Sequence, residues 1–306
     1  MRTLAFVLVS VAVVAVVGPT AAGKSELAVG LARRIGGEVV NADSMQLYRG
    51  MDVGTAKLPE AERRGVPHHL LDVWDVTRAA SVADYQRVAR AAIDDVIGRG
   101  ATPLLVGGSG LYVRAVIDRL DFPGTDPQLR IRLEAELTAA GPRPLYDRLK
   151  VTDPAAAARI PATNGRRIVR ALEVGEVTGA PYAVSMPPRE PYYDVVQIGL
   201  EPPRADLDER IEVRVGRMFD GGLVEEVRRL EQQGLRDGPT ASRALGYSHV
   251  LAMLDGKLTE AQARTETARA TRRLARRQRS WFAADDRVRW LATADLAGAL
   301  ALLPAS

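Results

Sequence analysis

An octapeptide near the N-terminus matches the G-x-x-x-x-G-K-[ST] pattern of a phosphate-binding loop. It reads Gly18-Pro19-Thr20-Ala21-Ala22-Gly23-Lys24-Ser25. The pattern requires a buried strand directly before the loop and a helix directly after it. The apolar run 12–17 supplies the strand, and Leu27, Leu31 and Ile35 recur at helical spacing after the loop. The chain is therefore predicted to begin its fold with the strand, loop and helix of an α/β domain.

The residues of the loop indicate what binds there. Glycines at positions 18 and 23 let the backbone curl, so that successive N–H groups converge on phosphate oxygens at the positive end of the following helix. Lys24 is expected to reach the terminal phosphates, and the Ser25 hydroxyl is a candidate ligand of Mg²⁺. The loop thus predicts a bound diphosphate or triphosphate, but it does not select a reaction.

The first residues superficially resemble a secretory signal, because Met1-Arg2 precede a nearly unbroken apolar run from Leu4 to Val17. That run is shorter than the ~20 apolar residues needed to span a bilayer. Cleavage near its end would destroy the phosphate-binding loop. We therefore interpret its second half as the buried strand, and expect a cytoplasmic protein without a membrane partner. Residues 1–11 remain an unexplained lead-in.

The rest of the chain alternates between strand-like and helical patterns, which predicts a three-layer α/β fold: a parallel sheet with helices on both faces. Between about 118 and 193 the strand signal disappears and Pro-punctuated helical stretches replace it, which predicts a helical insertion. The expected domains are a catalytic core at 12–117 and 194–306, with the insertion at 118–193. Strand-like runs lie at 38–41, 69–73, 102–106, 194–200 and 287–291, and helical patterns at 81–99 and 205–219.

Polar residues follow two of the expected strands. Asn41 to Ser44 come after one strand, and Gly107 to Gly110 after another. In open parallel sheets, ligands bind at the carboxyl ends of the strands. Both segments are therefore predicted to lie beside the phosphate-binding loop.

Positive charge is concentrated near the C-terminus. The net charge is +4, yet the segment from Arg264 to Arg289 holds nine basic residues against three acidic ones, so the rest of the chain sums to −2. No proline or glycine interrupts the stretch 259–284, which predicts one long helix. Its arginines lack acidic residues at matching spacing. A nucleic-acid phosphate backbone explains such a stripe better than a solvated, salt-bridged face. The stripe consists of Arg269, Arg272, Arg276 and Arg279, with Arg273 and Arg277 alongside.

Metal and redox chemistry are limited by composition. The chain has no cysteine, which excludes disulfides, thiolate zinc sites and cysteine catalysis. His68, His69 and His249 are the only histidines. No carboxylate lies at a metal-like spacing around them, so we expect structural or solvent-facing roles for all three.

Eight motifs follow one another along the chain: GPTAAGKS (18–25), ADSMQLYRGMDVGTAK (42–57), PHHLLD (67–72), SVADY (81–85), PLLVGGSGLYVRA (103–115), RRIVRALEV (166–174), RALGY (243–247) and RRLARRQRSWF (272–282). Taken together, they resemble the tRNA dimethylallyltransferases, in the order of that family and over the chain from 12 to 291. The resemblance implies transfer of a dimethylallyl group from its diphosphate to the exocyclic amine of the adenosine 3′-adjacent to a tRNA anticodon. Mg²⁺ would be the cofactor, and dimethylallyl diphosphate and the tRNA the partners. We expect a monomer.

Within this resemblance Asp43 is the candidate general base, because the adenine amine must lose a proton as the new bond forms. An acidic residue at this position in phosphate-loop enzymes can instead ligate Mg²⁺ through water. Position alone fits either role. Lys24 and Ser25 are the candidate catalytic groups that stabilise the leaving diphosphate.

Thr20 and Arg214 match further diphosphate contacts of the family. Arginine suits this role, since its planar fork can donate twice to one phosphate. Arg210 lies one helical turn before Arg214 and faces the same side. It is an alternative contact, or a surface partner of Glu225 or Glu226.

The resemblance also implies a set of positions that contact tRNA, with the target adenine drawn out of the anticodon loop toward Asp43. Taken alone, Trp281 and Phe282 favour core packing over base stacking. The implied tRNA positions are Asp43, Ser44, Met45, Gln46, Ser109, Arg130, Arg166, Arg167, Arg170, Arg243, Gly246, Tyr247, Arg276, Arg277, Gln278 and Trp281.

Three other functions are compatible with the loop. An adenylate prenyltransferase acting on free nucleotide would use the same loop and base, but it would not need two groups of arginines on helices. A small-molecule kinase would use the loop for ATP. A nucleotide-gated RNA-binding protein would need no chemistry at all.

Overall fold

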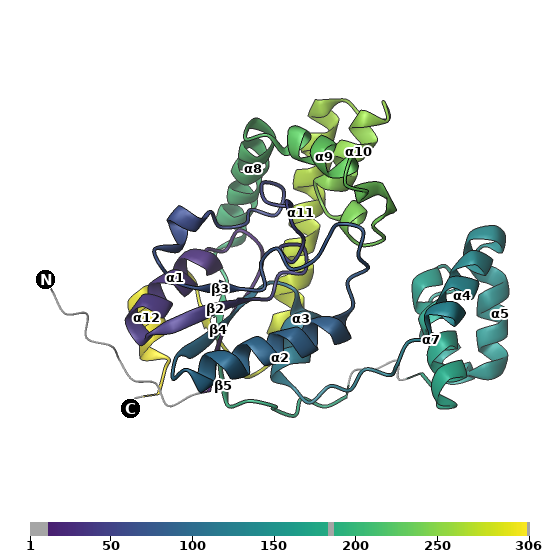
Figure 1. Cartoon of the computed structure of the whole chain (residues 1–306), viewed down its shortest axis with the longest axis horizontal. Coiled ribbons are helices and arrows are strands. Elements are labelled where there is room, and N and C mark those ends of the chain that lie inside the picture. Colours follow the sequence, from purple (N-terminus) through teal and green to yellow (C-terminus); the bar gives the residue numbers. More distant parts are fainter. Residues whose placement is uncertain (1–11, 183–186, 305–306) are drawn as a thin grey trace, which may run out of the picture. The chain divides into compact units, whose positions relative to one another are not determined.

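The computed structural model describes residues 12–182 and 187–304, so the lead-in 1–11 lies outside the described part. A parallel sheet lies among helices in the larger part of the structure (Figure 1). Its strands follow the order β3-β2-β4-β1-β5-β6. This order confirms the predicted parallel α/β fold. The strands are β1 (Val13–Val17), β2 (Gly37–Asn41), β3 (His68–His69), β4 (Thr102–Gly107), β5 (Val195–Leu200) and β6 (Val288–Leu291).

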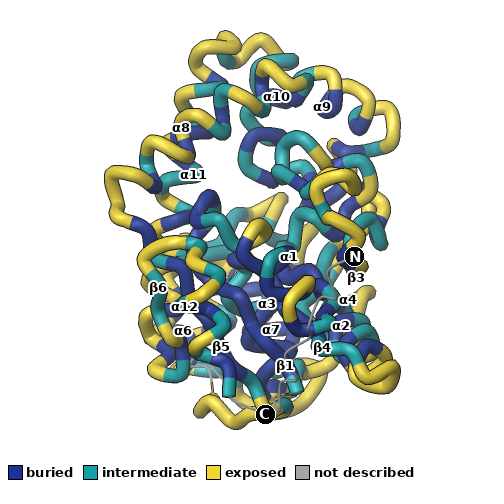
Figure 2. Tube along the Cα trace, turned by 90° about the vertical axis from the view of Figure 1, so that its left-hand side faces the viewer, coloured by how far each residue is buried: buried dark blue, intermediate teal, exposed yellow. Residues whose placement is uncertain are grey.

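Helices cover both faces of the sheet, and the side chains of β1 divide between them. Val14 and Val16 pack with α1 (Lys24–Ile35) and α12 (Leu296–Ala301). Val13, Ala15 and Val17 pack with α2 (Val82–Gly98) and α3 (Gly110–Ile117). All five residues of β1 are buried (Figure 2). A strand buried on both faces needs a continuous apolar run, which explains the sequence before the loop.

The predicted strand at 69–73 is wrong beyond its first residue. Leu70 and Asp72 have φ angles of 62° and 57°, which end the extended backbone after His69. Polar contacts hold this turn in place. Asn41 donates to the Leu70 carbonyl at 3.1 Å, and Lys57 forms an ion pair with Asp72 at 2.6 Å.

Four further helices form the rest of the sheet-bearing unit. The long helix α11 packs against α8 and α10 and begins with a capping box in which Thr259 and Gln262 each bond the other's backbone N–H. It confirms the single helix predicted for 259–284. The four are α8 (Arg204–Asp220), α9 (Leu223–Glu231), α10 (Tyr247–Leu254) and α11 (Glu260–Ala283); short 3₁₀ turns lie at Glu60–Arg63, Leu235–Asp237 and Ala241–Arg243.

Residues Leu120–Glu190 form a second compact unit with a core of its own. Leu133, Leu149 and Ile168 are fully buried in it. Prolines at the first turn start three of its helices, where no backbone N–H is needed. The helices are α4 (Pro127–Ala140), α5 (Pro142–Thr152), α6 (Pro154–Ala157) and α7 (Gly165–Thr178).

The chain leaves the sheet-bearing unit and returns to it at adjacent points. Asp118 forms an isolated antiparallel bridge with Pro191, and the Tyr192 N–H donates to the Ile117 carbonyl at 2.8 Å. The Arg90 guanidinium lies 3.6 Å from the centre of the Tyr192 ring. The two ends of the insertion are therefore fixed to the same edge of the core.

Candidate active site

The phosphate-binding loop joins β1 to α1 and has the backbone that its sequence predicts. Gly18 and Gly23 have φ angles of 132° and 96°, where side chains are strained. A β-carbon at Gly18 would also lie 2.6 Å from the Leu200 carbonyl oxygen. Both glycines are therefore required by the shape of the loop.

Lys24 lies at the floor of the loop. Its Nζ donates to the Pro19 carbonyl at 2.7 Å. Burial lowers the pKa of Lys24 to about 8, with a smaller opposing effect from Asp43 and a further lowering from Arg214. The Asp43 carboxylate and the Arg214 guanidinium are thus near enough to Lys24 to influence its charge.

A cavity of about 440 Å³ opens above this lysine. Its lining includes Lys24 and Ser25 from the loop, Asp43 from the end of β2, and Arg214 from α8. The predicted meeting of the loop with the segment after β2 is thus present in the structure. Gln46 and Lys57, which lie further along the same segment, line the cavity as well.

Asp43 is held by its neighbours in the chain. Its N–H donates to Asn41 Oδ1 at 2.9 Å, and its own Oδ1 accepts the N–H of Met45 at 2.9 Å. Asn41 is fixed in turn, because its Nδ2 donates to the carbonyls of Asp43 and Leu70. Within residues 12–182 and 187–304, Oδ2 of Asp43 has no hydrogen-bond partner. This oxygen is available to accept a proton or to bind a cation.

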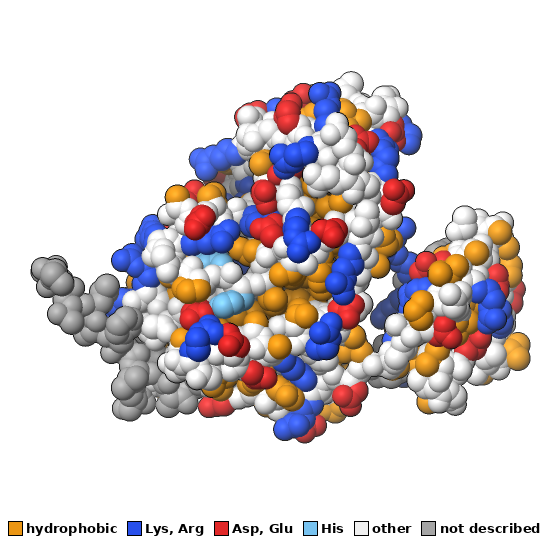
Figure 3. All heavy atoms as spheres, viewed as in Figure 1, with side chains coloured by type: hydrophobic (Ala, Val, Ile, Leu, Met, Phe, Trp, Pro, Cys, Tyr) orange, Lys and Arg blue, Asp and Glu red, His pale blue; other side chains and the backbone are white. Residues whose placement is uncertain are grey.

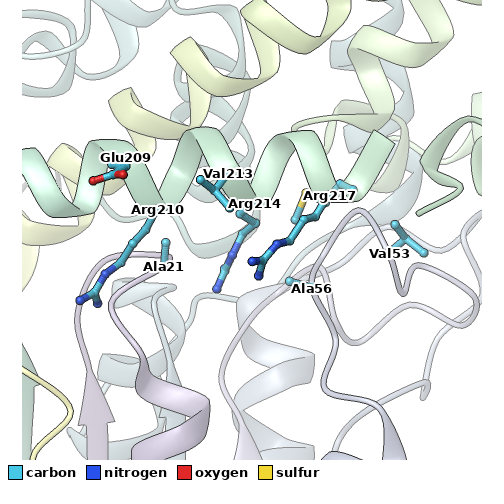
Figure 4. A pocket seen from close by; sticks show the side chains of 9 residues that line it. Ala21, Val53, Ala56, Glu209, Arg210, Val213, Arg214 and Arg217 are labelled. Carbon is cyan, nitrogen blue, oxygen red and sulfur yellow. The ribbon is translucent and has the colours of Figure 1, made fainter. Parts of the chain in front are cut away.

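Helix α8 contributes Arg214 to the lining of this cavity. Arg214 Nη1 donates to Thr20 Oγ1 at 3.3 Å, and burial lowers the pKa of Arg214. A second cavity of about 560 Å³ shares Ala21 and Arg214 with the first, and Figure 4 shows Arg210, Arg214 and Arg217 extending from α8 toward the loop. Arg217 was missed in the sequence, although its spacing from the other two places it on the same helical face.

Glu226 cannot be the surface partner suggested for Arg210, because it is 3% exposed and fully engaged elsewhere. Its carboxylate accepts the backbone N–H groups of Asp52, Val53 and Gly54 at 2.8–3.1 Å. It also accepts the hydroxyl of Tyr247 at 2.6 Å. Glu226 therefore fixes the segment that carries Thr55, Ala56 and Lys57 into the cavity wall.

Replacing Glu226 with glutamine should destabilise the protein by about 1–3 kcal/mol, because an amide NH₂ would face backbone donors that then lack an acceptor. Urea unfolding measures this change. Glu225→Gln is the matched control, since Glu225 is the exposed neighbour on α9 and should shift stability by less than about 0.5 kcal/mol. Equal effects of the two variants would show that the Glu226 contacts contribute nothing specific.

Tyr247 was predicted among the tRNA positions, but its side chain is 0% exposed. Its ring occupies the space where Gly54 lacks a β-carbon, and its hydroxyl bonds Glu226. The tyrosine therefore supports the cavity wall from behind, and its ring is not available to a partner.

Helix α11 contacts the loop and the turn after β4. The Thr20 N–H donates to Gln278 Oε1 at 2.9 Å. In the same region the Ser44 N–H donates to Ser109 Oγ at 3.2 Å, which joins two of the predicted tRNA positions. The prediction that Trp281 and Phe282 are both core anchors is half wrong, since Phe282 is 3% exposed but Trp281 is 38% exposed.

The prediction that the arginines of α11 lack acidic partners is wrong for part of the stripe, since Arg269 pairs with Glu266 on the same helix at 3.0 Å. Arg272 forms an ion pair with Glu212 of α8 at 2.7 Å, and Arg279 pairs with Glu201 after β5. Across the face shown in Figure 3, basic and acidic side chains are likewise interleaved on the larger unit. Arg276 and Arg277 are exposed, and in the described part of the chain neither has an ion-pair partner.

The arginines of the second unit divide in the same way. Arg130 and Arg170 both pair with Glu173, which is 0% exposed, and Arg170 also donates to the carbonyls of Pro123 and Gly124. These two arginines hold their own unit together. Arg166 and Arg167 begin α7 and are exposed.

The histidines have structural partners. His68 Nδ1 lies 2.9 Å from the Val66 carbonyl, His69 pairs with Glu38 at 2.6 Å, and His249 lies 3.0 Å from the Thr267 hydroxyl. Across the described ranges, no group of three or more His, Cys, Asp or Glu side chains is placed to hold a metal ion. No helix within these ranges has the length and apolar character needed to cross a membrane.

Comparisons with known proteins agree on one family. The family model for IPP transferases matches residues 46–285. The tRNA dimethylallyltransferase of Salinispora arenicola is 65% identical, over 92% of this chain and 82% of its own. That of Streptomyces avermitilis is 64% identical, over 93% and 92%.

Solved structures give the same result. The tRNA isopentenylpyrophosphate transferase of Bacillus halodurans is 43% identical with a TM-score of 0.68, over 91% of this chain and 89% of its own. A eukaryotic dimethylallyltransferase acting on tRNA is 26% identical with a TM-score of 0.79, over 93% of this chain and 74% of its own.

Proposed function

The chain belongs to the IPP transferase family, and on that premise we propose that it transfers a dimethylallyl group from dimethylallyl diphosphate to tRNA. The acceptor is N6 of the adenosine immediately 3′ of the anticodon in tRNAs that read codons beginning with U, and diphosphate is released. Relatives that are tRNA dimethylallyltransferases support this proposal and confirm the resemblance found in the motifs. The observation that carries it is the single cavity lined by Lys24, Asp43 and Arg214.

The loop and its arginine suit a leaving diphosphate. As the bond from the allylic carbon to oxygen breaks, negative charge grows on the diphosphate. Backbone N–H groups of the loop, the Lys24 ammonium and the Arg214 guanidinium surround the volume where that charge would develop. Donors that are fixed before the reaction stabilise such charge without reorganising.

Asp43 is the proposed general base. The nitrogen of the adenine amine forms a bond to the allylic carbon and loses a proton, and Oδ2 of Asp43 is the acceptor that we assign. Its other oxygen is already bonded to the Met45 N–H, which fixes the orientation of the carboxylate. General base catalysis requires this kind of orientation in addition to a suitable pKa.

Mg²⁺ is the proposed cofactor, and the residues present fit it. The Ser25 hydroxyl is exposed beside the loop, and the Asp43 carboxylate lines the same cavity. Mg²⁺ binds few protein oxygens and takes the rest of its ligands from substrate phosphates and water. Ser25 would hold the ion, with Asp43 as the alternative ligand through water. When bound, it would neutralise charge on the diphosphate oxygens.

The exposed arginines of α11 are the proposed contacts to the tRNA backbone. Replacing Arg276 and Arg277 together with alanine should weaken anticodon stem-loop binding about tenfold or more. It should also lower the slope of log affinity against log salt by about 2, because each phosphate contact contributes roughly one unit. Fluorescence anisotropy over a salt series measures both quantities.

Arg272 and Arg279 provide the matched control, since they lie on the same helix but are paired with Glu212 and Glu201. Replacing both with alanine should change the salt slope by less than the first pair does. If both double variants lower the salt slope equally, the ion pairs with Glu212 and Glu201 do not keep Arg272 and Arg279 from contacting RNA phosphates.

The proposed reaction is tested with labelled dimethylallyl diphosphate offered to an anticodon stem-loop or to free AMP. Labelling of the stem-loop is expected. Preferential labelling of AMP would instead identify an adenylate prenyltransferase, and γ-phosphate transfer from ATP without prenyl transfer would identify a kinase. We propose that the enzyme is a monomer and acts in the cytoplasm.

A further inference from the structure

One contact joins the arginine-bearing helix directly to the phosphate-binding loop. Gln278 of α11 accepts the N–H of Thr20 through Oε1 at 2.9 Å. The two residues are 258 positions apart in the sequence. Thr20 also bonds Arg214 through its hydroxyl, so its backbone and side chain are held from two different helices. The conformation of the loop thus depends on where α11 lies.

The turn after β4 is shaped to receive α11. A β-carbon at Gly108 would overlap the amide of Gln278, and one at Gly110 would overlap the indole of Trp281. Gln278 and Trp281 are three residues apart and so lie on the same side of the helix. The two glycines therefore form a socket, which we define as Gly108 and Gly110, into which these two side chains of α11 fit.

The same helix carries the exposed arginines. Arg276 and Arg277 directly precede Gln278, and α11 runs without a break from Glu260 to Ala283. An anion bound to these arginines would therefore restrain α11 as a whole, including Gln278 and Trp281, which fill the socket. Anything that fixes the helix there also fixes the acceptor of the Thr20 N–H.

We propose that Gln278 is a positioning residue that couples the two substrates of the enzyme, an inference that rests on the proposed function. RNA phosphates on Arg276 and Arg277 hold α11 in the socket, and Gln278 then orders the loop before the diphosphate arrives. A loop that is already ordered loses less conformational entropy on binding, which makes the coupling positive. By linkage, diphosphate must tighten RNA binding by the same factor.

Calorimetry with inorganic diphosphate tests the coupling, because this probe carries no prenyl group and no reaction occurs. For the unmodified protein, an anticodon stem-loop should tighten diphosphate binding about fivefold or more, which is the lower end of typical coupling between sites. Gln278→Met keeps the length and packing of the side chain but removes the acceptor. It should reduce that ratio, which is taken between diphosphate affinities with and without the stem-loop for the same variant, to about one.

Gly108→Ala provides a second route to the same result, since the added methyl group would displace the Gln278 amide. The methyl group would also lie 3.1 Å from the Gly18 carbonyl oxygen, so diphosphate affinity without RNA is measured for this variant as well. Gly98→Ala is its control, because a β-carbon at Gly98 meets nothing within 4 Å. Thermal unfolding of each variant separates loss of coupling from loss of fold. An unchanged ratio in Gln278→Met, or a ratio of one in the unmodified protein, would overturn the proposal.

Failure of this inference is distinguishable from failure of the proposed function. If the ratio is one but labelled dimethylallyl diphosphate still modifies the stem-loop, the function stands and the coupling is wrong. If the stem-loop neither binds nor becomes labelled, both are wrong.

Discussion

Replacing Asp43 with asparagine is expected to slow single-turnover transfer to an anticodon stem-loop by about 10²–10⁴-fold, the usual contribution of a general base. Asparagine has nearly the same shape and can still accept the Met45 N–H through Oδ1. It cannot take a proton from the adenine amine. Rapid-quench measurement with enzyme in excess isolates this step from product release.

The affinity for dimethylallyl diphosphate distinguishes the two roles that remain open for Asp43. If Asp43 acts only as the base, Asp43→Asn leaves this affinity unchanged. If Asp43 is a ligand of Mg²⁺, its loss raises the magnesium concentration needed for half-maximal rate. Asp75→Asn, at an exposed carboxylate that pairs with Arg49, is the control. Near-normal single-turnover transfer by Asp43→Asn would exclude the general-base role.

Loss of the Lys24 ammonium is the second large effect. Lys24→Met should lower the transfer rate by about 10²–10³-fold, comparable to removal of one fixed donor from a developing anion. The pKa of about 8 gives this residue a pH signature. Below that pKa the ammonium is charged and binds the diphosphate. As the pH rises through it, the charge is lost and the affinity falls.

Titration of dimethylallyl diphosphate binding between pH 7 and 9.5, without RNA, measures this effect. Lys24→Arg keeps a positive charge over the whole range and should give a nearly flat profile. A flat profile for the unmodified protein would mean that Lys24 does not titrate in the free site. Lys257→Met, at an exposed lysine paired with Asp255, controls for a general loss of charge.

Much of the fold could be predicted because its signals are local. The apolar run before the loop, the glycines within it and the alternation of strands and helices each follow from a few neighbouring residues. The strand at 69–73 failed for the opposite reason. Its residues favour extended backbone, but Asn41 and Lys57, which are distant in sequence, hold Leu70 and Asp72 in a turn.

The same distinction applies to the site. The loop and Asp43 come from motifs whose residues are neighbours, so the sequence was enough to expect them in one cavity. The roles of Glu226 and Tyr247 depend on a loop that lies 172–174 positions before Glu226, and no pattern along the chain indicates that contact. The carboxylates that neutralise Arg272 and Arg279 likewise come from elements outside α11.

The adjacent ends of the insertion have a consequence for how such an enzyme could diversify. Asp118 bridges Pro191 and the Ile117 carbonyl accepts the Tyr192 N–H, so the residues directly before and directly after the insertion are held beside each other. The length and sequence of the segment between these contacts can therefore change while β5, which follows it, keeps its pairing with β1. The insertion can therefore vary, in evolution or by recombining modules from different relatives, without altering the phosphate-binding loop and Asp43, which belong to the sheet-bearing unit.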